Sequence, residues 1–425
     1  MVLECLCILP HGALLLDSRQ HLTCAPEACD RLAGEVCEFV ASMEACCDNI
    51  FAPPLSADTI VVLTPHGHQC EDRFLIYRNA RAYGSAAWDG CWSTYTISCT
   101  IDTSCVDALC EHFASSSLSG HDGGGGGGGD DDHDDDARHV PILKPFIAFS
   151  ETAEAPLGWG EVVPLYFIAK AWERRRLSLS LPHLQSTPTC PAPTSASGPT
   201  EEKTDTNSSD HAPILSKVAS SLSLPPVIII SLPLQRRRFD ENFPFILRNF
   251  ATTLTSFLEA EKQSFALVIS ADLAHTHPAP LTHPHPPYPP LLNGIPEQFD
   301  QMIERLLFSL RGYKVPSEEM DHTAPSVPTT LSNPTNSQHS HSPRSSSSLS
   351  LPTTSSATLI KDLIALFREH QVGCCGLSGV IILHEIMHAL PHFHFLREHY
   401  ARFHPTYYGM LTAVFKRLRD TSGLL

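Results

Sequence analysis

Ala266-Leu267-Val268-Ile269-Ser270-Ala271-Asp272-Leu273-Ala274-His275 decides the fold, because an apolar, β-branched run ends there in polar residues and a histidine. Two further runs share this design. Ile8-Leu9-Pro10-His11 closes an apolar start, and Thr59-Ile60-Val61-Val62-Leu63 leads into Thr64-Pro65-His66-Gly67. Short continuous apolar runs are typical of strands buried on both faces of a sheet. We therefore predict three interior strands that each end in a histidine.

Helical patterns separate these runs, and Val227-Ile228-Ile229-Ile230-Ser231 adds another apolar strand. Strands that alternate with amphipathic helices indicate a sheet covered on both faces. We therefore predict an α/β fold, a three-layer α/β/α domain around a mixed, mostly parallel sheet. In such sheets, ligands bind beyond the carboxyl ends of the strands. The helices are expected at about residues 28–43, 245–262, 296–311 and 359–370.

Four low-complexity stretches interrupt this pattern, and one of them contains a run of glycines from Gly123 to Gly129. Stretches rich in serine, proline, glycine and aspartate cannot bury enough apolar surface to offset the entropy of ordering them. Without them, roughly 300 of the 425 residues remain, which favours one large domain over 1–425. The expected disordered inserts cover about residues 115–137, 183–212, 277–290 and 316–358.

Charge and cysteine content exclude several classes of protein. The formal net charge is -17, and no broad basic face is visible that would bind nucleic acid. No run reaches the ~18 apolar residues that span a membrane, and the apolar start lacks the basic region of a signal peptide. The 15 cysteines lack paired zinc-ribbon spacing and are expected to be reduced thiols. We therefore expect a cytoplasmic protein whose partners include neither nucleic acid nor a membrane.

His11, His66 and His275 follow the three predicted strands. If these strands lie side by side, the three imidazoles converge at one edge of the sheet, and neutral imidazole is a common ligand of iron, copper and zinc. The proline before His11 and before His66 favours an extended approach, and the glycine after each lets the chain turn. With 24 histidines in the chain, any single one is more often an exposed loop residue. Three at equivalent strand ends indicate a metal site.

Six short motifs occur along the ordered part of the chain. They are Pro10-His11-Gly12-Ala13, Thr64-Pro65-His66-Gly67, Gly160-Glu161-Val162-Val163-Pro164-Leu165-Tyr166, Ser270-Ala271-Asp272-Leu273-Ala274-His275, Cys375-Gly376-Leu377 and Tyr408-Gly409-Met410-Leu411. Each motif is weak alone. Their order resembles the class III extradiol ring-cleavage dioxygenase superfamily, which comprises the LigB-like catalytic subunits and their Memo-like relatives. The resemblance spans nearly the whole ordered chain.

The resemblance implies an oxidoreductase with a non-haem Fe(2+) site, in which His11 and His66 bind the ion and His275 is the acid–base residue. The implied reaction opens a catechol-like ring, so the partners are a small aromatic diol and O2. Cys375 is the positional match for the third ligand, and Glu385 is the nearby carboxylate. A thiolate ligand would favour Zn(2+) or Cu. The substrate pocket is expected to include His68, Asp272, Trp159 and Glu161.

Two departures from the enzymes favour a second hypothesis, a Memo-like metal-binding or redox protein without ring-cleavage activity. Trp159 stands where the enzymes usually have histidine, and Gly158 stands where they have aspartate. Cys375 matches the Cys-Gly element of the Memo-like members. Both hypotheses leave a homo-oligomer open.

His384-Glu385-Ile386-Met387-His388 supports a third hypothesis, a zinc metallopeptidase. In that pattern two histidines one helical turn apart bind zinc, and the glutamate activates water. His394 has the spacing of the third metzincin ligand, but Pro391 replaces a glycine that needs positive φ. The interpretation that we favour for this motif is a histidine-bearing helix packed on the sheet.

Overall fold

The computed structural model describes the chain in segments. These are residues 3–12, 15–16, 26–53, 56–68, 70, 73–86, 95–118, 143–180, 222–233, 242–275, 294–310, 355–370, 373–404 and 408–417. The predicted inserts at about 183–212 and 277–290 lie outside the described residues. The same is true of most of the predicted inserts at 115–137 and 316–358.

A ten-stranded mixed sheet forms the centre of the described structure. Its strands are β1 (Leu3–Leu9), β2 (Thr59–Thr64), β3 (Phe74–Tyr77), β6 (Leu143–Phe146), β8 (Val227–Ser231), β9 (Phe265–Ser270), β10 (Asp272–His275), β11 (Gly373–Cys374), β12 (Phe393–Phe403) and β13 (Tyr408–Arg417). They lie in the order β11-β10-β13-β1-β9-β2-β8-β3-β6, and β12 pairs with β13. The predicted α/β class with a mixed sheet and a parallel centre is therefore confirmed.

The four central strands β1, β9, β2 and β8 are parallel neighbours. Every residue of β1, β2, β8 and β9 is buried, as the continuous apolar runs predicted. In the register, Leu9 pairs with Ser270, and Leu63 pairs with Ile269. Because the strands run in one direction, their carboxyl ends meet at one edge of the sheet. The segments that carry His11, His66 and His275 therefore start from the same edge.

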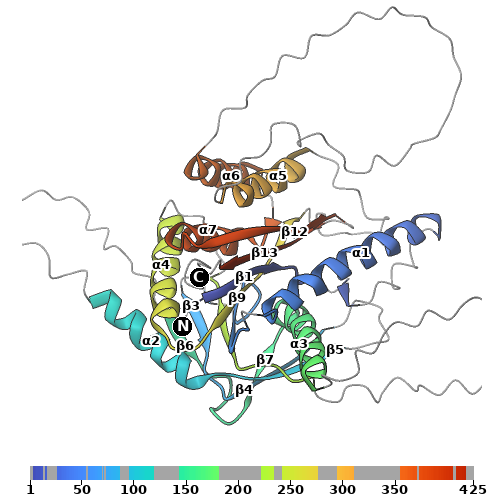
Figure 1. Cartoon of the computed structure of the whole chain (residues 1–425). Helices are drawn as coiled ribbons and strands as arrows, with labels where there is room; N and C mark the ends of the chain where they lie inside the picture. Colours follow the sequence, from blue (N-terminus) through green and yellow to red (C-terminus); the bar gives the residue numbers. More distant parts are fainter. Residues whose placement is uncertain are drawn as a thin grey trace, which may run out of the picture.

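Helices cover both faces of this sheet (Figure 1). On one side lie α1 (Pro26–Ile50) and α3 (Trp159–Ser180), which pack against each other. On the other side lie α2 (Thr103–Leu118), α4 (Phe243–Ala260) and α7 (Leu377–Ala389). A further pair, α5 (Gly294–Ser309) and α6 (Ser356–His370), packs together beyond α7, and α5 contacts β10. The predicted three-layer arrangement is thus present.

Some predicted boundaries were wrong, for identifiable reasons. α1 runs to Ile50, past the predicted end at 43, because its buried stripe continues through Cys46 and Cys47. α2 extends to Leu118, so the first insert was predicted to begin too early. α6 begins at Ser356, so the fourth insert was predicted to end too late. In both cases, serines at a helix terminus resemble the low-complexity sequence beside them.

A small second sheet leads the chain into the start of α3. It contains β5 (Tyr95–Thr100), β4 (Arg81–Ala86) and β7 (Glu154–Leu157), in the order β5-β4-β7. β7 ends two residues before Trp159, which begins α3. The loop between β6 and β7 contains Phe149, a non-glycine residue with φ of 58°. This loop and the second sheet together determine where α3 begins.

Asn79 holds the loop that precedes β7. Its fully buried amide nitrogen donates to the carbonyl oxygens of Ala148, Ser150 and Ala153 at 3.1, 2.8 and 2.9 Å. Its side-chain oxygen accepts from the backbone N–H of Ala148 at 2.9 Å. A buried amide that satisfies several backbone groups is costly to remove, because those groups lose their partners without regaining water.

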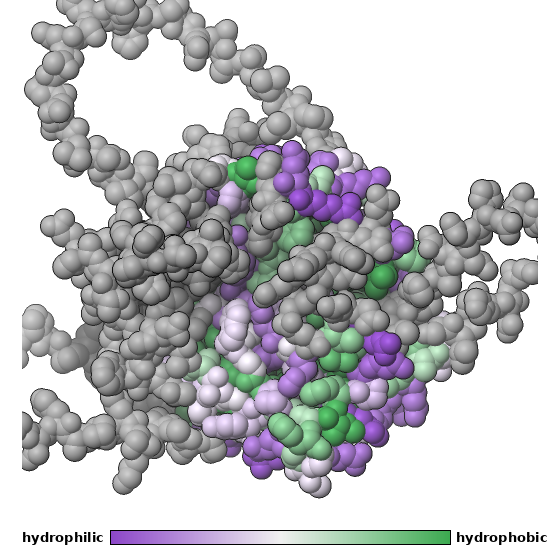
Figure 2. All heavy atoms as spheres, turned by 180° about the vertical axis from the view of Figure 1, so that it is seen from behind, coloured by the Kyte–Doolittle hydropathy of each residue, from purple (hydrophilic) through white to green (hydrophobic). Residues whose placement is uncertain are grey.

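No helix in the described segments is both long enough and apolar enough to cross a membrane. On the face opposite to that of Figure 1, hydrophilic and hydrophobic residues are interspersed over the described surface (Figure 2).

We predict that Asn79→Ala lowers the free energy of unfolding by about 2–4 kcal/mol, because it leaves buried carbonyl and N–H groups of the 148–153 loop unpaired. Urea denaturation followed by circular dichroism measures this change. Ser98→Ala, which removes an exposed hydroxyl bonded to Arg81, is the matched control and should change stability by less than about 0.5 kcal/mol. Equal effects of the two substitutions would contradict the structural role of Asn79.

Candidate metal centre

Five side chains from distant parts of the chain meet at the carboxyl edge of the parallel strands. His11 follows β1, His66 follows β2, Asp272 and His275 lie on β10, and Cys375 lies between β11 and α7. They form two overlapping groups that could hold a cation, His11 with His66 and Cys375, and Asp272 with His275 and Cys375. Within each group the donor atoms lie within 4.8 Å of one another. The structure thus brings the three predicted ligands together, with His275 beside them.

His11 is fully buried, and its neighbours determine which ring nitrogen carries the proton. The hydroxyl of Ser270 donates its hydrogen to the carbonyl oxygen of Gly160, at 2.6 Å. Its oxygen therefore accepts from Nδ1–H of His11, which lies 2.8 Å away. Burial lowers the pKa of His11 well below its usual value, and the two neighbouring histidines lower it further, so the ring is neutral. Nε2 of His11 is then the unprotonated nitrogen, which is the form that binds metal.

Cys375 lies between the two groups of possible ligands. Its Sγ is 3.2 Å from Nε2 of His11 and 3.5 Å from Nε2 of His275. Burial raises the pKa of this thiol well above its usual value, and the negative charge of Asp272 raises it further. A cation at this point would have the opposite effect, because positive charge stabilises the thiolate. Two imidazoles and one sulfur are a donor set that fits a transition-metal ion such as zinc, copper or iron.

Asp272 connects three of the segments that form the site. Its Oδ1 accepts the backbone N–H of His11 at 3.0 Å, and its Oδ2 lies 3.3 Å from Nε2 of the same residue. Its carbonyl oxygen accepts the backbone N–H of Gly376 at 3.2 Å. A Cβ at Gly376 would lie 2.6 Å from that carbonyl oxygen, so only glycine allows Cys375 to come this close to β10. Burial raises the pKa of Asp272 to about 7.

Trp159 lies across both imidazoles of the first group. Its ring centroid is 4.2 Å from that of His66 and 4.9 Å from that of His11. It is the first residue of α3 and remains 42% exposed. A Cβ on the next residue, Gly160, would lie only 2.6 Å from Cβ of His66. The start of α3 therefore packs directly on His66, and this contact places the indole over the site.

Glu161, which was predicted to line the pocket, is instead fully buried and supports the loop after β2. Its carboxylate accepts the hydroxyl of Tyr77 at 3.1 Å and the backbone N–H of Gly158 at 2.9 Å. The oxygen of Tyr77 accepts the backbone N–H of His68 at 2.9 Å. A Cβ at Gly67 would lie 2.8 Å from both Glu161 and Tyr77, so a glycine is needed there for space and not for a sharp turn.

His68, also predicted to line the pocket, lies on the Phe146 side of this loop. The two ring centroids are 4.1 Å apart, and burial lowers the pKa of His68. His68 belongs to neither of the two cation groups found among the described residues. Ser270 and Tyr77 are the supporting residues to which the sequence analysis gave no role. The signal that could have identified Ser270 is a hydroxyl residue at the end of a buried strand, as in Val268-Ile269-Ser270.

The structure does not bring Glu385, the alternative third ligand, to this site. It lies on α7 and forms an ion pair with Arg248 of α4, with Nε and Oε2 3.0 Å apart. His384 and His388 face each other on the same helix, whereas His394 lies on β12, where it pairs with Lys416. Among the described residues, the groups close enough to hold a cation do not include His394. The motif lies on a helix that packs on the sheet, since α7 contacts β9 and α4.

Comparisons with known proteins add little to this description. No protein-family model matches the chain, and no curated protein matches it. Among solved structures, the chain is similar to the uncharacterized protein JW3007 from Escherichia coli K12, with 9% identity and a TM-score of 0.36. The similarity covers 97% of this chain and 99% of the other. A likeness at this level supports no argument about the site.

We predict that ionisation of Glu161 lowers the stability of the protein as pH rises from 5 to 8, and that Glu161→Gln removes this contribution, whereas the lowered pKa values of His11, His68 and His404 act in the opposite direction in both proteins. Burial raises the pKa of Glu161 from 4.5 to about 7, so the folded state keeps a proton that the unfolded state has lost. The resulting stabilisation is fully present below pH 4.5 and is lost as pH rises through about 7. Asp272 and Asp300, whose pKa values burial also raises to about 7, act in the same direction.

Gln keeps the shape of the side chain but cannot ionise. Chemical denaturation should show that the free energy of unfolding of Glu161→Gln, measured relative to wild type, rises by roughly 1–3 kcal/mol between pH 5 and pH 8. Glu151→Gln, at a side chain that is 76% exposed, is the control and should leave the wild-type profile unchanged. Parallel profiles for wild type and Glu161→Gln would contradict the assignment of a buried carboxyl group with a raised pKa.

Proposed function

We propose that this chain is a non-haem, metal-dependent dioxygenase that opens a catechol-like aromatic diol with O2. The observation that carries the proposal is the convergence of His11, His66 and Cys375 on one point, with His275 beside it. The ligands come from different strand ends, so the site is formed by the fold and not by a local motif. The order of the six sequence motifs supports the same function.

A bound ferrous ion would supply a chelation point for the two diol oxygens and a route for electrons to O2. In the group of His11, His66 and Cys375, the chain itself fixes the tautomer of His11. Ser270 holds the ring so that the lone pair of Nε2 points toward Cys375. The backbone N–H of His11 donates to Asp272, which fixes the chain at this position, and a turn of the ring would break the buried hydrogen bond between Nδ1 and Ser270.

His275 is the residue proposed to move protons. Its Nε2 is 3.5 Å from Sγ of Cys375, one of the residues that would hold the ion. Imidazole can accept a proton from a hydroxyl and return it later, because its pKa lies near ambient pH. Trp159, which is 42% exposed and lies over both ligand imidazoles, offers an aromatic surface for a planar substrate.

A second candidate function is a Memo-like metal-binding or redox protein without ring-cleavage activity. Two observations favour it. The sulfur of Cys375, and not the carboxylate of Glu385, completes the group with His11 and His66. Trp159 packs on both imidazoles, where a substrate would otherwise approach. A thiolate ligand favours copper or zinc over iron.

We also propose a cytoplasmic location. Eleven of the cysteines in the described part of the chain form no disulfide bond, including the neighbouring Cys5 and Cys7, whose sulfurs lie 3.4 Å apart. Free thiols that persist in such numbers and at such distances are typical of a reducing compartment.

The test is O2 uptake by protein purified without oxygen and loaded with Fe(2+), using catechol and its carboxylated and alkylated derivatives as substrates. We expect wild type to consume one O2 per diol opened. His275→Ala should retain the ion and lose about 10²–10⁴-fold in kcat, which is the usual contribution of a general acid–base residue. His112→Ala, at a surface histidine bonded to Ser256, is the control and should keep full activity.

Three outcomes separate the candidates. Uptake that depends on His275 supports the dioxygenase. Bound copper or zinc without uptake for any diol supports the second candidate. A metal content that is no higher in wild type than in Cys375→Ser contradicts both.

A further inference from the structure

His384 and His388 form a second pair of facing imidazoles, which shares no residue with the candidate metal centre. They lie one turn apart on α7, and their Nε2 atoms are 3.1 Å apart. The ring centroids are separated by 4.4 Å with an interplanar angle of 59°. His384 is 4% exposed, whereas His388 lies at the surface, so the space between the two nitrogens can be reached from solvent.

Glu385 determines the tautomer of His384. Its Oε1 lies 3.3 Å from Nδ1 of His384. The guanidinium of Arg248 pairs with both of its oxygens, so the group is a carboxylate. A carboxylate can only accept hydrogen bonds, so Nδ1 of His384 carries the proton. Nε2 is then unprotonated, and its lone pair faces His388.

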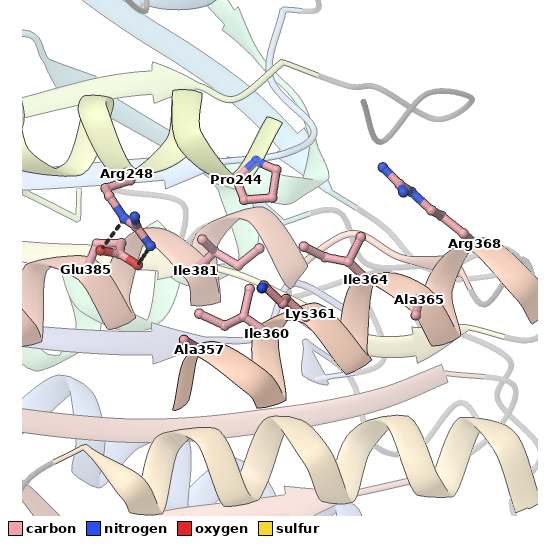
Figure 3. Close-up of a pocket in the computed structure, with 10 residues that line it drawn as sticks. All are labelled: Pro244, Arg248, Ala357, Ile360, Lys361, Ile364, Ala365, Arg368, Ile381 and Glu385. Atoms are coloured by element: carbon pink, nitrogen blue, oxygen red, sulfur yellow. Dashed lines mark hydrogen bonds and ion pairs between the residues drawn. The ribbon is translucent and has the colours of Figure 1, made fainter. Parts of the chain in front are cut away.

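Arg248 holds Glu385 in this position. The guanidinium of Arg248 contacts both carboxylate oxygens, with Nε to Oε2 at 3.0 Å and Nη2 to Oε1 at 3.4 Å (Figure 3). A carboxylate held by an arginine and a histidine is poorly placed to activate water, as a zinc peptidase requires. It is well placed as the outer partner of a metal-binding histidine, in the carboxylate–histidine–metal arrangement.

We propose that His384 and His388 chelate a divalent cation of the Zn(2+) class at a second site, with Glu385 as a positioning residue. Zinc binds imidazole nitrogen at about 2.0–2.1 Å, so two nitrogens 3.1 Å apart subtend roughly 100° at the ion. This angle is close to that of a tetrahedral site.

A third donor lies nearby on another helix. The hydroxyl oxygen of Ser356, the first residue of α6, is 3.4 Å from Nε2 of His388. A cation shared with Ser356 would tie the start of α6 to α7. These two helices, with α4, also line an apolar groove of about 420 Å³ whose wall includes Ile360, Ile381 and Glu385 (Figure 3). The remaining coordination positions are left to water or to a donor from a bound molecule.

The site differs from that of a zinc peptidase in two testable respects. It does not use His394, which lies on β12 and outside the pair. Its glutamate acts through His384 and not on water. The proposal is also independent of the candidate metal centre, since it shares no residue with the groups of His11, His66, Asp272, His275 and Cys375.

The test is Zn(2+) content after equilibrium dialysis of the full chain, compared between variants. We expect His388→Ala and His388→Gln to bind one equivalent less than wild type, and His394→Ala to bind the wild-type amount. Glu385→Ala should weaken the second site by about tenfold or more, because it removes the partner that orients His384. Circular dichroism checks that each variant is folded.

Replacing Zn(2+) by Co(2+) separates the two sites by their donors. In Cys375→Ser, the pair on α7 should still give visible d–d bands, without a sulfur charge-transfer band. If the candidate metal centre binds no metal, wild type should hold one equivalent of metal instead of two. His388→Ala should then remove that one equivalent. Unchanged metal content in both His388 variants would overturn the proposal and leave the two imidazoles sharing a proton. Equal losses in His388→Ala and His394→Ala would also overturn it, in favour of a three-histidine site.

Discussion

The hydroxyl of Ser270 makes the hydrogen bonds on which the candidate metal centre depends. It donates to the carbonyl oxygen of Gly160 at the start of α3 and accepts from Nδ1–H of His11, so these two hydrogen bonds join a helix to a strand end. Because the hydroxyl has only one proton to donate, His11 must present Nε2 as a bare nitrogen toward Cys375. The same link holds α3 against the site, and with it Trp159 over the two ligand imidazoles.

The parallel sheet makes this link possible. β1, β9 and β2 are paired in register, so His11, Ser270 and His66 leave the sheet at one edge. Asp272 then joins a fourth segment, because its carbonyl oxygen accepts the N–H of Gly376 and draws Cys375 toward β10. The geometry of the site therefore rests on backbone pairing.

Much of this arrangement could be predicted from the sequence. The runs that end at His11, His66 and His275 identified the interior strands, since strands buried on both faces have no polar positions. Other parts could not be predicted. The first half of α3 is buried almost all round and carries Pro164, so it shows no helical periodicity. The prediction that Glu161 lines a pocket was wrong, because its partner Tyr77 lies on β3, which no local pattern connects to the start of α3.

The motif on α7 was also ambiguous, because a local motif does not show contacts with residues far away in the sequence. His384-Glu385-Ile386-Met387-His388 contains every residue of the zinc-peptidase motif. Its glutamate, however, forms an ion pair with Arg248 of α4. That contact joins residues 137 positions apart, so it cannot be predicted from the motif. Sequence spacing correctly placed the two histidines on one side of a helix, but the role of the glutamate depends on tertiary structure.

The central claim is that His11, His66 and Cys375 bind one ion. It is tested most directly by zinc-edge X-ray absorption on a His388→Ala protein that carries a single Zn(2+). The account predicts one sulfur neighbour at about 2.3 Å and imidazole nitrogens at about 2.0–2.1 Å, with the sulfur lost in Cys375→Ser. A nitrogen and oxygen shell without sulfur, identical in the two proteins, would contradict it.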